Sequence, residues 1–304
     1  MNILITGGTG FVGSHMVDYI LKYAIRPDQK VYCTKRWMED TKNLDHIDHD
    51  SFEYIDCDLL DGMSVKRAVE ISKPEKVFHF AAQSFPEVSF KTPVVTLQTN
   101  IIGTTHLLES IKESEYDPTI VSVSSSEVYG NPNEDEIPIT EENPIRPANP
   151  YSISKVGHDL MSQYYHKAYG MKIITTRMFS HEGARRGKQF ALSSFAYQIA
   201  KNEKLKGDGV VKHGNLDSVR TYNHIEDAIQ AIHLLKDAGL KVQTHWMPNL
   251  PGATPELDIA MFDRAIYSHT LQSDDWKIYP TIVTKTSDRD NNEVYTVIEK
   301  WYNE

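Results

Sequence analysis

Asn2-Ile-Leu-Ile-Thr6-Gly7-Gly-Thr-Gly10-Phe-Val-Gly13 is the stretch of this 304-residue chain that decides its fold. An apolar run, a glycine-rich turn and an amphipathic segment to about Tyr23 follow one another, which predicts strand, turn and helix. Gly7 would allow a tight turn, Gly10 would let backbone N–H groups approach a pyrophosphate, and Gly13 would let the helix pack on the strand. We therefore predict a dinucleotide site, with a ligand-free glycine turn as the alternative. Its predicted contacts are Gly7, Gly10, Phe11, Val12 and Gly13.

Strand and helix patterns alternate outward from that turn. Apolar runs predict strands at residues 30–34, 52–55, 76–80, 119–124 and 172–177, and helical spacing predicts helices at 63–72, 93–113 and 151–169. Such alternation is typical of a parallel, doubly wound α/β sheet, the Rossmann arrangement. We expect a dinucleotide-binding domain over 1–177, with a returning segment near 213–236, and a smaller, interleaved substrate domain over 178–304. In that second region helices are expected at 190–201, 225–236, 255–269 and 293–302.

Composition narrows the class of protein. Hydrophobic residues make up 40% of the chain and charged residues 24%, as in an ordinary globular protein. The formal charge of -10 argues against nucleic acid or an anionic membrane as the main partner. Cys33 and Cys57 are the only cysteines, which excludes a disulfide framework and a zinc-ligand pattern. The apolar start reads as a first strand rather than a signal peptide, so we expect a cytoplasmic protein.

Lys35 and Arg36 follow the second predicted strand, at the position that decides the cofactor. An NAD-preferring site usually places a carboxylate there for the ribose hydroxyls, whereas cations suit a 2′-phosphate. The next acid is Glu39, so the sequence predicts NADP over NAD, with a solvated basic pair as the alternative. Further cofactor contacts are expected at the ends of later strands, at Asp58 and Leu59 beside the adenine and at Ala81 and Ala82.

Tyr151 and Lys155 are four residues apart, so on a helix they share one face. A free phenol loses its proton near pH ~10, and a neighbouring ammonium favours the phenolate. Ser125, at the end of the fifth predicted strand, can hydrogen-bond both the phenol and a substrate oxygen. Such a trio suits removal of a proton from an alcohol while a hydride leaves its carbon. The spacing alone is weak, and a surface Tyr–Lys pair is its alternative reading.

Together these motifs resemble the extended short-chain dehydrogenase/reductase family of nucleotide-sugar enzymes, and within it the GDP-mannose 4,6-dehydratases. The resemblance runs from residue 2 to about residue 236. The segments that carry it are Ala81-Ala-Gln-Ser84 with Val88-Ser-Phe90, Ser125-Ser-Glu127, His181-Glu182 with Arg185-Arg-Gly187, and His213-Gly-Asn-Leu-Asp217 with Arg220 and Asp227. The departures fall in nucleotide and sugar recognition. Ser180 stands where the family usually has asparagine, Ser193-Ser194 replaces an Arg-Lys pair, and no Arg-Pro-x-Glu-Val-Asp segment is recognisable.

The resemblance implies a redox-neutral dehydration by a hydro-lyase. Tyr151 with Ser125 would take the proton of the sugar 4-hydroxyl, Lys155 would lower the pKa of the phenol and bind the nicotinamide ribose, and Glu127 would remove the C5 proton. Hydride would leave C4 for NADP and return to C6 after loss of water, giving a 4-keto-6-deoxy sugar. The expected substrate contacts are Gln83, Ser84, Ser126, Ser180 and Arg220, with a GDP-sugar favoured. Arg185 and Arg186 resemble loop residues that help bind cofactor across a subunit interface, which implies a homodimer or homotetramer, with a surface pair as the alternative.

Two other functions stay open. A nucleotide-sugar 4-reductase or C4 epimerase needs only Ser125, Tyr151 and Lys155, and it is the pairing of Glu127 with the 181–186 loop that favours a dehydratase. A non-catalytic NADP-sensing protein would need no such trio. A reductase consumes NADPH stoichiometrically, whereas a dehydratase produces no net change in cofactor.

Overall fold

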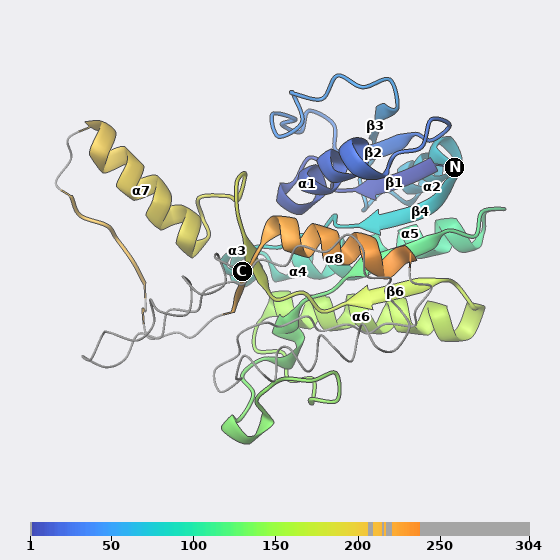
Figure 1. The fold of residues 1–304 in the computed structure, drawn as a ribbon. Coiled ribbons are helices and arrows are strands. Elements are labelled where there is room, and N and C mark those ends of the chain that lie inside the picture. The colour runs from blue at the N-terminus through green and yellow to red at the C-terminus, as the bar shows by residue number, and fades with distance from the viewer. Residues whose placement is uncertain (1, 206–208, 215, 217–220, 238–304) are drawn as a thin grey trace, which may run out of the picture.

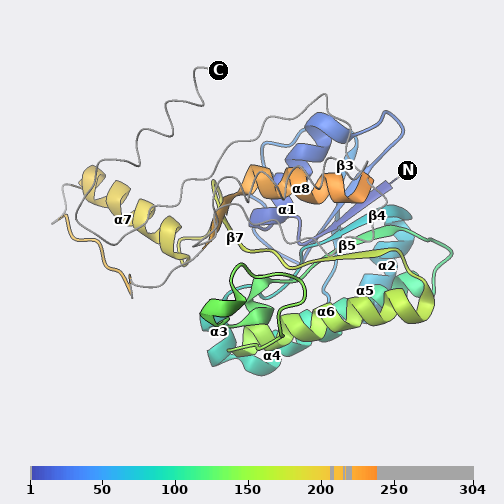
Figure 2. The same ribbon diagram turned by 60° about the horizontal axis from the view of Figure 1, so that its bottom comes forward.

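The computed structural model describes residues 2–205, 209–214, 216 and 221–237, and a parallel sheet lies at its centre (Figures 1 and 2). Within these residues the large sheet has six strands in the order β3-β2-β1-β4-β5-β6. The strands are β1 (Asn2–Thr6), β2 (Val31–Lys35), β3 (Phe52–Asp56), β4 (Pro74–His79), β5 (Thr119–Val123) and β6 (Ile173–Thr176). The order reverses between β1 and β4, where ligands bind in open α/β sheets. The prediction of a doubly wound parallel sheet is confirmed.

Helices cover both faces of this sheet (Figure 2). Alternate residues of β1 face opposite sides, so Ile3 and Ile5 join one buried cluster and Leu4 joins the other. The first cluster lies against α1 (Phe11–Tyr19) and α8 (Ile225–Asp237). The second lies against α2 (Gly62–Ser72), α5 (Gly103–Lys112) and α6 (Pro150–Tyr169). Because Ile225 and Ile229 of α8 are buried beside α1, the chain returns to the sheet after residue 220.

The N-terminus of α6 is strongly specified by local sequence. Asn149 accepts a hydrogen bond from the Ser152 N–H at 2.8 Å, Ser152 Oγ in turn accepts from the Asn149 N–H at 2.9 Å, and Pro150 is the first helical residue. Gly170 ends the helix in the left-handed conformation, with φ +70°. Tyr151 therefore lies in the first turn of α6.

The segment predicted as one helix over 93–113 is divided. It contains α4 (Pro93–Leu97), a π-helical turn η2 (Gln98–Ile102) and α5, and it is preceded by the short helix α3 (Pro86–Lys91), which the sequence pattern did not indicate. A second π-helical turn, η1 (Ile20–Ala24), extends α1. Two 3₁₀ turns, η3 (Ser126–Tyr129) and η4 (Glu134–Glu136), follow β5.

After β6 the elements become shorter. Strands β7 (Ser180–Glu182) and β8 (Tyr222–His224) pair in parallel, and α7 (Ala191–Leu205), expected at 190–201, lies away from the main sheet in both ribbon views (Figures 1 and 2). The helices expected at 255–269 and 293–302 lie outside the described residues. The division into domains at residue 177 stays a prediction.

Candidate active site

The glycine turn is packed so tightly that side chains have no room. Gly7 has φ +67°, and a Cβ atom there would lie 2.7 Å from Ala81 Cα. A Cβ on Gly13 would lie 2.3 Å from the Gly7 carbonyl oxygen. Gly8, which the sequence argument did not select, is equally constrained, because a Cβ there would lie 2.3 Å from Cys33 Sγ. The turn thus brings bare backbone to the edge of β1 and β4.

The groups around this turn fit the pyrophosphate of a dinucleotide. Helix α1 begins after Gly10 with no side-chain cap and no acidic residue in its first turn, so its first N–H groups and positive dipole end are free for an anion. The Thr9 hydroxyl is buried without a hydrogen-bond partner and can donate to a phosphate oxygen. Gln83 Oε1 is also buried and unpartnered, but it can only accept, so it suits a hydroxyl group rather than the pyrophosphate. Phe11 and Val12 are the first residues of that helix, so the predicted contacts with a cofactor lie together.

A hollow of about 500 Å³ lies at the carboxyl ends of β2 and β3. Both predicted 2′-phosphate ligands already have carboxylate partners: Lys35 Nζ lies 2.6 Å from Asp56 Oδ1, and Arg36 Nη2 lies 3.5 Å from Glu39 Oε1. Asp58 lines the hollow, and its contact with an adenine stays a prediction. Leu59 does not line the hollow, because its side chain packs in the core against Gly103. The lining residues are Arg36, Trp37, Met38, Glu39, Asp56, Cys57, Asp58, Asp61, Ser64 and Arg67.

Tyr151 is buried beside Ser125, as the proton-transfer hypothesis requires. Burial raises the pKa of the Tyr151 phenol to about 12; a hydrogen bond with Ser125 lowers that pKa, the charge of Glu127 raises it, and the charge of Arg186 lowers it. The expectation that Lys155 depresses the phenol pKa is therefore wrong for this arrangement. The Lys155 ammonium instead donates to the Val123 carbonyl at 2.6 Å.

Lys155 lies one turn further along α6 and is also buried. Burial lowers its pKa to about 8, and the charge of Asp159 partly opposes that shift. Lys155 is therefore mostly protonated at neutral pH and loses its proton in mildly alkaline solution. Such a group can both bind a hydroxyl and exchange a proton with its surroundings.

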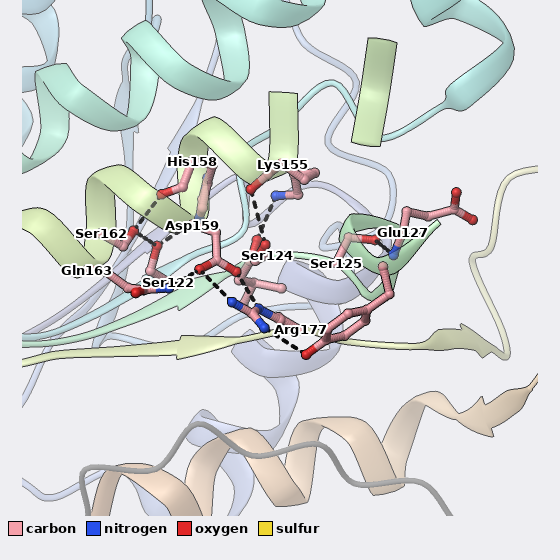
Figure 3. Close-up of polar contacts among 12 residues, drawn as sticks. Ser122, Ser124, Ser125, Glu127, Lys155, His158, Asp159, Ser162, Gln163 and Arg177 are labelled. Atoms are coloured by element: carbon pink, nitrogen blue, oxygen red, sulfur yellow. Dashed lines mark hydrogen bonds and ion pairs between the residues drawn. The ribbon is translucent and has the colours of Figure 1, made fainter. Parts of the chain in front are cut away.

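Glu127 is held on η3, directly after β5 (Figure 3). Ser125 Oγ caps this turn by accepting from the Glu127 N–H at 3.2 Å, and Asn149 Nδ2 donates to Glu127 Oε2 at 3.4 Å. The Glu127 side chain points away from the buried Arg177 and Asp159 in the close-up. The four predicted catalytic residues thus lie at one edge of the sheet, Ser125 and Glu127 at the cap and on η3, and Tyr151 and Lys155 on α6.

Comparison with known proteins agrees with this geometry. A family model described as GDP-mannose 4,6 dehydratase matches residues 4–244. The chain belongs to this family. GDP-mannose 4,6-dehydratase of Yersinia enterocolitica is 31% identical over 237 residues, covering 75% of this chain and 62% of the relative. dTDP-glucose 4,6-dehydratase of Haemophilus influenzae is 31% identical, covering 79% and 72%. The chain therefore spans about three fifths of the length of the Yersinia relative.

Solved structures extend the comparison to the fold. DesIV, a dTDP-glucose 4,6-dehydratase from Streptomyces venezuelae with NAD and TYD bound, matches with a TM-score of 0.69 and 29% identity over 77% of this chain and 71% of that one. RMD from Pseudomonas aeruginosa, complexed with NADPH, matches with a TM-score of 0.65 and 27% identity over 78% and 74%. UDP-glucose 4-epimerase of Thermotoga maritima matches with a TM-score of 0.67 and 26% identity over 77% and 73%.

The 183–190 loop of this chain packs onto its own α1. Arg185 pairs with Asp18 at 2.6 Å, and His15 Nε2 donates to the Ala184 carbonyl at 2.9 Å. The Arg186 guanidinium lies 3.5 Å from the centre of the Phe190 ring and 5.0 Å from that of Phe11. The resemblance implied that Arg186 reaches a neighbouring subunit. In the described chain the guanidinium lies against Phe11 and Phe190, and a contact across a subunit interface stays a prediction.

The predicted substrate contacts are spread along this edge. Gln83 is fixed by Asn100, whose Oδ1 accepts from the Gln83 N–H at 2.8 Å and whose Nδ2 donates to the Gln83 carbonyl at 2.9 Å. Ser84 and Ser180 are exposed, and the Ser126 N–H donates to the Met178 carbonyl at 2.9 Å. Arg220 lies outside the described residues. Among the residues that the structure does describe, no group of histidine, cysteine and carboxylate side chains could hold a metal ion.

Two buried residues of this family member were missed from the sequence, Asn100 and His158. Asn100 Nδ2 also donates to Ser154 Oγ at 2.8 Å, one helical turn from Tyr151. His158 contacts Thr104 Oγ1 at 2.9 Å and Ser122 Oγ at 2.8 Å, and its ring stacks on His79 at 5.4 Å. The only sequence signal for either was a polar residue at an otherwise buried helical position.

Proposed function

We propose that this chain is a nucleotide-sugar 4,6-dehydratase, which oxidises C4, eliminates water across C5 and C6 and returns the hydride to C6. The observation that carries the proposal is the convergence of Tyr151, Ser125 and Glu127 at the sheet edge beside the glycine turn. The 4,6-dehydratases among the relatives support the same reaction class.

The first step needs a base for the sugar 4-hydroxyl. Tyr151 holds its proton in the described arrangement, because burial raises its pKa to about 12. A cation that approaches the phenol favours the phenolate, and Arg186 already acts in that direction. Ser125, which hydrogen-bonds the phenol, is placed to pass the hydroxyl proton to Tyr151 Oη. Lys155 supplies a second mobile proton close by.

The second step needs a carboxylate for the C5 proton, and Glu127 fills this role. Asn149 donates to its Oε2 atom, and this contact orients the carboxylate without burying it completely. A 4-keto group acidifies the neighbouring C–H bond, so a carboxylate is a sufficient base. A reductase has no such elimination to catalyse, so Glu127 separates the two activities.

A bound nicotinamide cofactor would supply the hydride acceptor at C4 and the donor at C6. Solved relatives hold NAD or NADPH. We propose NADP for this chain, on the basis of Lys35 and Arg36, with Asp56 and Glu39 as the carboxylates that a 2′-phosphate would have to displace. Michaelis constants for the two cofactors test this, with a lower KM for NADP expected. A clear preference for NAD would contradict it.

An oligomer is also proposed, in the form of a homodimer or homotetramer. Ile153, Leu160 and Tyr164 are exposed on α6, and Val94 and Val95 are exposed on the neighbouring α4. Exposed apolar side chains at helical spacing favour burial against another subunit. Light scattering after gel filtration should give at least twice the chain mass; a monomer at micromolar concentration would contradict the proposal.

The reaction is tested by incubation with GDP-mannose, and with dTDP-, UDP- and CDP-hexoses in parallel. A dehydratase product is lighter by one water, about 18 Da, and GDP-mannose is the expected substrate. Tyr151→Phe should abolish the mass loss, whereas Tyr23→Phe, at an exposed position on η1, should not. Stoichiometric oxidation of NADPH would instead identify a reductase, and an unchanged mass with altered sugar stereochemistry would identify an epimerase.

The epimerase is the second candidate, because UDP-glucose 4-epimerase shares the fold. Glu127 beside the Ser125 and Tyr151 pair favours the dehydratase over it.

A further inference from the structure

Arg177, the residue directly after β6, makes a buried polar cluster behind the candidate active site (Figure 3). Its Nε donates to Asp159 Oδ2 at 2.8 Å and its Nη2 to Asp159 Oδ1 at 3.4 Å. Its Nη1 donates to Tyr129 Oη at 2.7 Å. The guanidinium carbon also lies 5.2 Å from the centre of the Tyr129 ring. One guanidinium therefore joins two side chains from different elements.

Each partner of Arg177 lies beside a predicted catalytic residue. Tyr129 is the last residue of η3 and comes two positions after Glu127. Asp159 lies one helical turn beyond Lys155 on α6, so the two side chains share a face. Gln163 Nε2 donates to Asp159 Oδ1 at 2.6 Å, and this contact completes the surroundings of the carboxylate. The cluster thus connects the turn that carries Glu127 with the helix that carries Lys155.

Stability alone is a poor explanation for such a cluster. Desolvating an ion pair costs several kcal/mol per ion, and apolar residues of similar volume often serve a core equally well. The charged pair does, however, fix the relative orientation of the groups that it joins. The planar guanidinium must meet the carboxylate on one edge and the phenol oxygen on another, and this fixes the distance between η3 and α6.

The charges are consistent with a permanent unit. Burial lowers the pKa of Arg177, but the hydrogen bonds to Asp159 and Tyr129 more than offset this and raise it above the ordinary value. The charge of Asp159 also opposes the downward shift of the Lys155 pKa. Asp159 therefore affects Lys155 in two ways: its pairing with Arg177 holds the helix that carries Lys155, and its charge raises the Lys155 pKa.

We propose that Arg177, Asp159 and Tyr129 are positioning residues that hold the Glu127 turn against the Lys155 helix. This proposal deepens the proposed dehydratase function and rests on it for its kinetic consequence. None of the three residues belongs to the predicted substrate or cofactor contacts. Loosening the unit should therefore lower kcat and leave KM nearly unchanged.

The test compares Tyr129→Phe with Tyr165→Phe. Both changes remove one buried phenol oxygen, but the Tyr165 hydroxyl contacts Glu109 and joins α6 to α5, away from η3. Because small misplacement of catalytic groups is costly, Tyr129→Phe should reduce kcat about 10- to 100-fold with KM within about twofold. Tyr165→Phe should leave both constants within about twofold of wild type. Equal effects of the two changes would overturn the proposal.

A pH profile of Asp159→Asn supplies a readout that loss of packing would not move. Without the Asp159 charge the pKa of Lys155 should fall further, so the limb of the kcat profile assigned to Lys155 should move to lower pH. The assignment is made with Lys155→Met, which should lack that limb. An unmoved limb in a folded Asp159→Asn protein would count against action through Lys155.

Amide hydrogen exchange separates this proposal from the proposed function, because it needs no substrate. Tyr129→Phe should speed exchange at η3, where the Gly130 N–H donates to the Glu127 carbonyl at 3.1 Å, and Tyr165→Phe should not. Should the wild-type protein dehydrate no nucleotide sugar, the proposed function fails while exchange still decides whether the unit holds η3. An active wild type with unchanged η3 exchange in Tyr129→Phe defeats the positioning proposal alone.

Discussion

At the scale of single residues, Tyr151 combines two opposing influences. Burial keeps the phenol protonated, with a pKa of about 12, while Ser125 and Arg186 favour its ionised form. Burial also makes each nearby charge more effective, because the local dielectric is low. A phenol in this environment responds strongly to the charge of whatever binds beside it.

Glu127→Gln should separate oxidation from elimination. The amide cannot take the C5 proton, so turnover should fall ~10²–10⁴-fold while C4 oxidation is reduced far less. Chemical quench should show the 4-keto hexose accumulating without loss of water. Glu142→Gln, at an exposed carboxylate, is the control and should retain full activity. Full turnover in the Glu127 variant would exclude its role as base.

The depressed pKa of Lys155 predicts how stability depends on pH. Its folded pKa is about 8 and its ordinary value is 10.5, so between these values the unfolded chain binds more protons. Unfolding free energy should therefore rise with pH across this window, by at most about 1.4 kcal/mol per pH unit from this group. Urea denaturation should show that increment in wild type and in Lys167→Met, at an exposed lysine of α6, and not in Lys155→Met.

At the scale of elements, the strands were predictable to within about two residues because each is a short apolar run that ends at small or polar residues. The helix over 93–113 was not predicted correctly. Asn100 satisfies its amide with Gln83 and Ser154, and η2 widens around it. Gln83 and Ser154 are both more than one helical turn from Asn100 in sequence, so the hydrophobic periodicity of the 93–113 segment could not predict these contacts. The pairing of β7 with β8 was missed for the same reason.

The candidate site follows the same division. Tyr151, Lys155 and Ser125 could be predicted to meet because carboxyl ends of parallel strands lie at one edge of a sheet. The partners of Lys35 and Arg177 could not, because Asp56 is supplied by another strand and Tyr129 by a turn 48 residues away. Long-range ion pairs decide the electrostatics of this site, and single-sequence patterns do not report them.

Asn149→Ala tests whether the cap of α6 also serves the site. Loss of an N-cap costs about 1 kcal/mol of stability, and Asn149 additionally donates to Glu127. Asp61→Ala removes the N-cap of α2, where Asp61 accepts from the Met63 N–H at 3.0 Å, far from η3. Both variants should lose similar stability in urea. Because Asp61 also lines the hollow at β2 and β3, kcat is measured with saturating cofactor. Only Asn149→Ala should then lower kcat, and equal kcat values would show that Asn149 acts only as a helix cap.

At the scale of the whole molecule, one face of the sheet is covered in part by α8, a helix from beyond residue 220. Ile225 and Ile229 are buried against the same cluster as Met16 and Val17 of α1. The returning segment expected near 213–236 is consistent with that packing. The opposite face is covered by α5 and α6. There the buried rings of His79 and His158 both contact Thr104 Oγ1 of α5.

The stacked pair His79 and His158 predicts sensitivity to acid. Burial lowers the pKa of His79 to about 3 and holds the pKa of His158 well below 6.5. In the unfolded chain both rings take up protons below pH ~6.5, so stability should fall as pH drops from there, by up to about 1.4 kcal/mol per pH unit for each ring. Denaturation between pH 7 and 4 should show a shallower slope in His158→Gln than in His213→Gln, an exposed control.

The contact of Gly8 with Cys33 has a practical consequence. Burial raises the pKa of the Cys33 thiol to about 12, and Cys57, also buried, has a raised pKa for the same main reason. Alkylating reagents react with the thiolate, so both cysteines of the folded protein should react slowly with iodoacetamide. The rate at which Cys33 is alkylated should then report how often the glycine turn opens, and a bound dinucleotide should lower that rate.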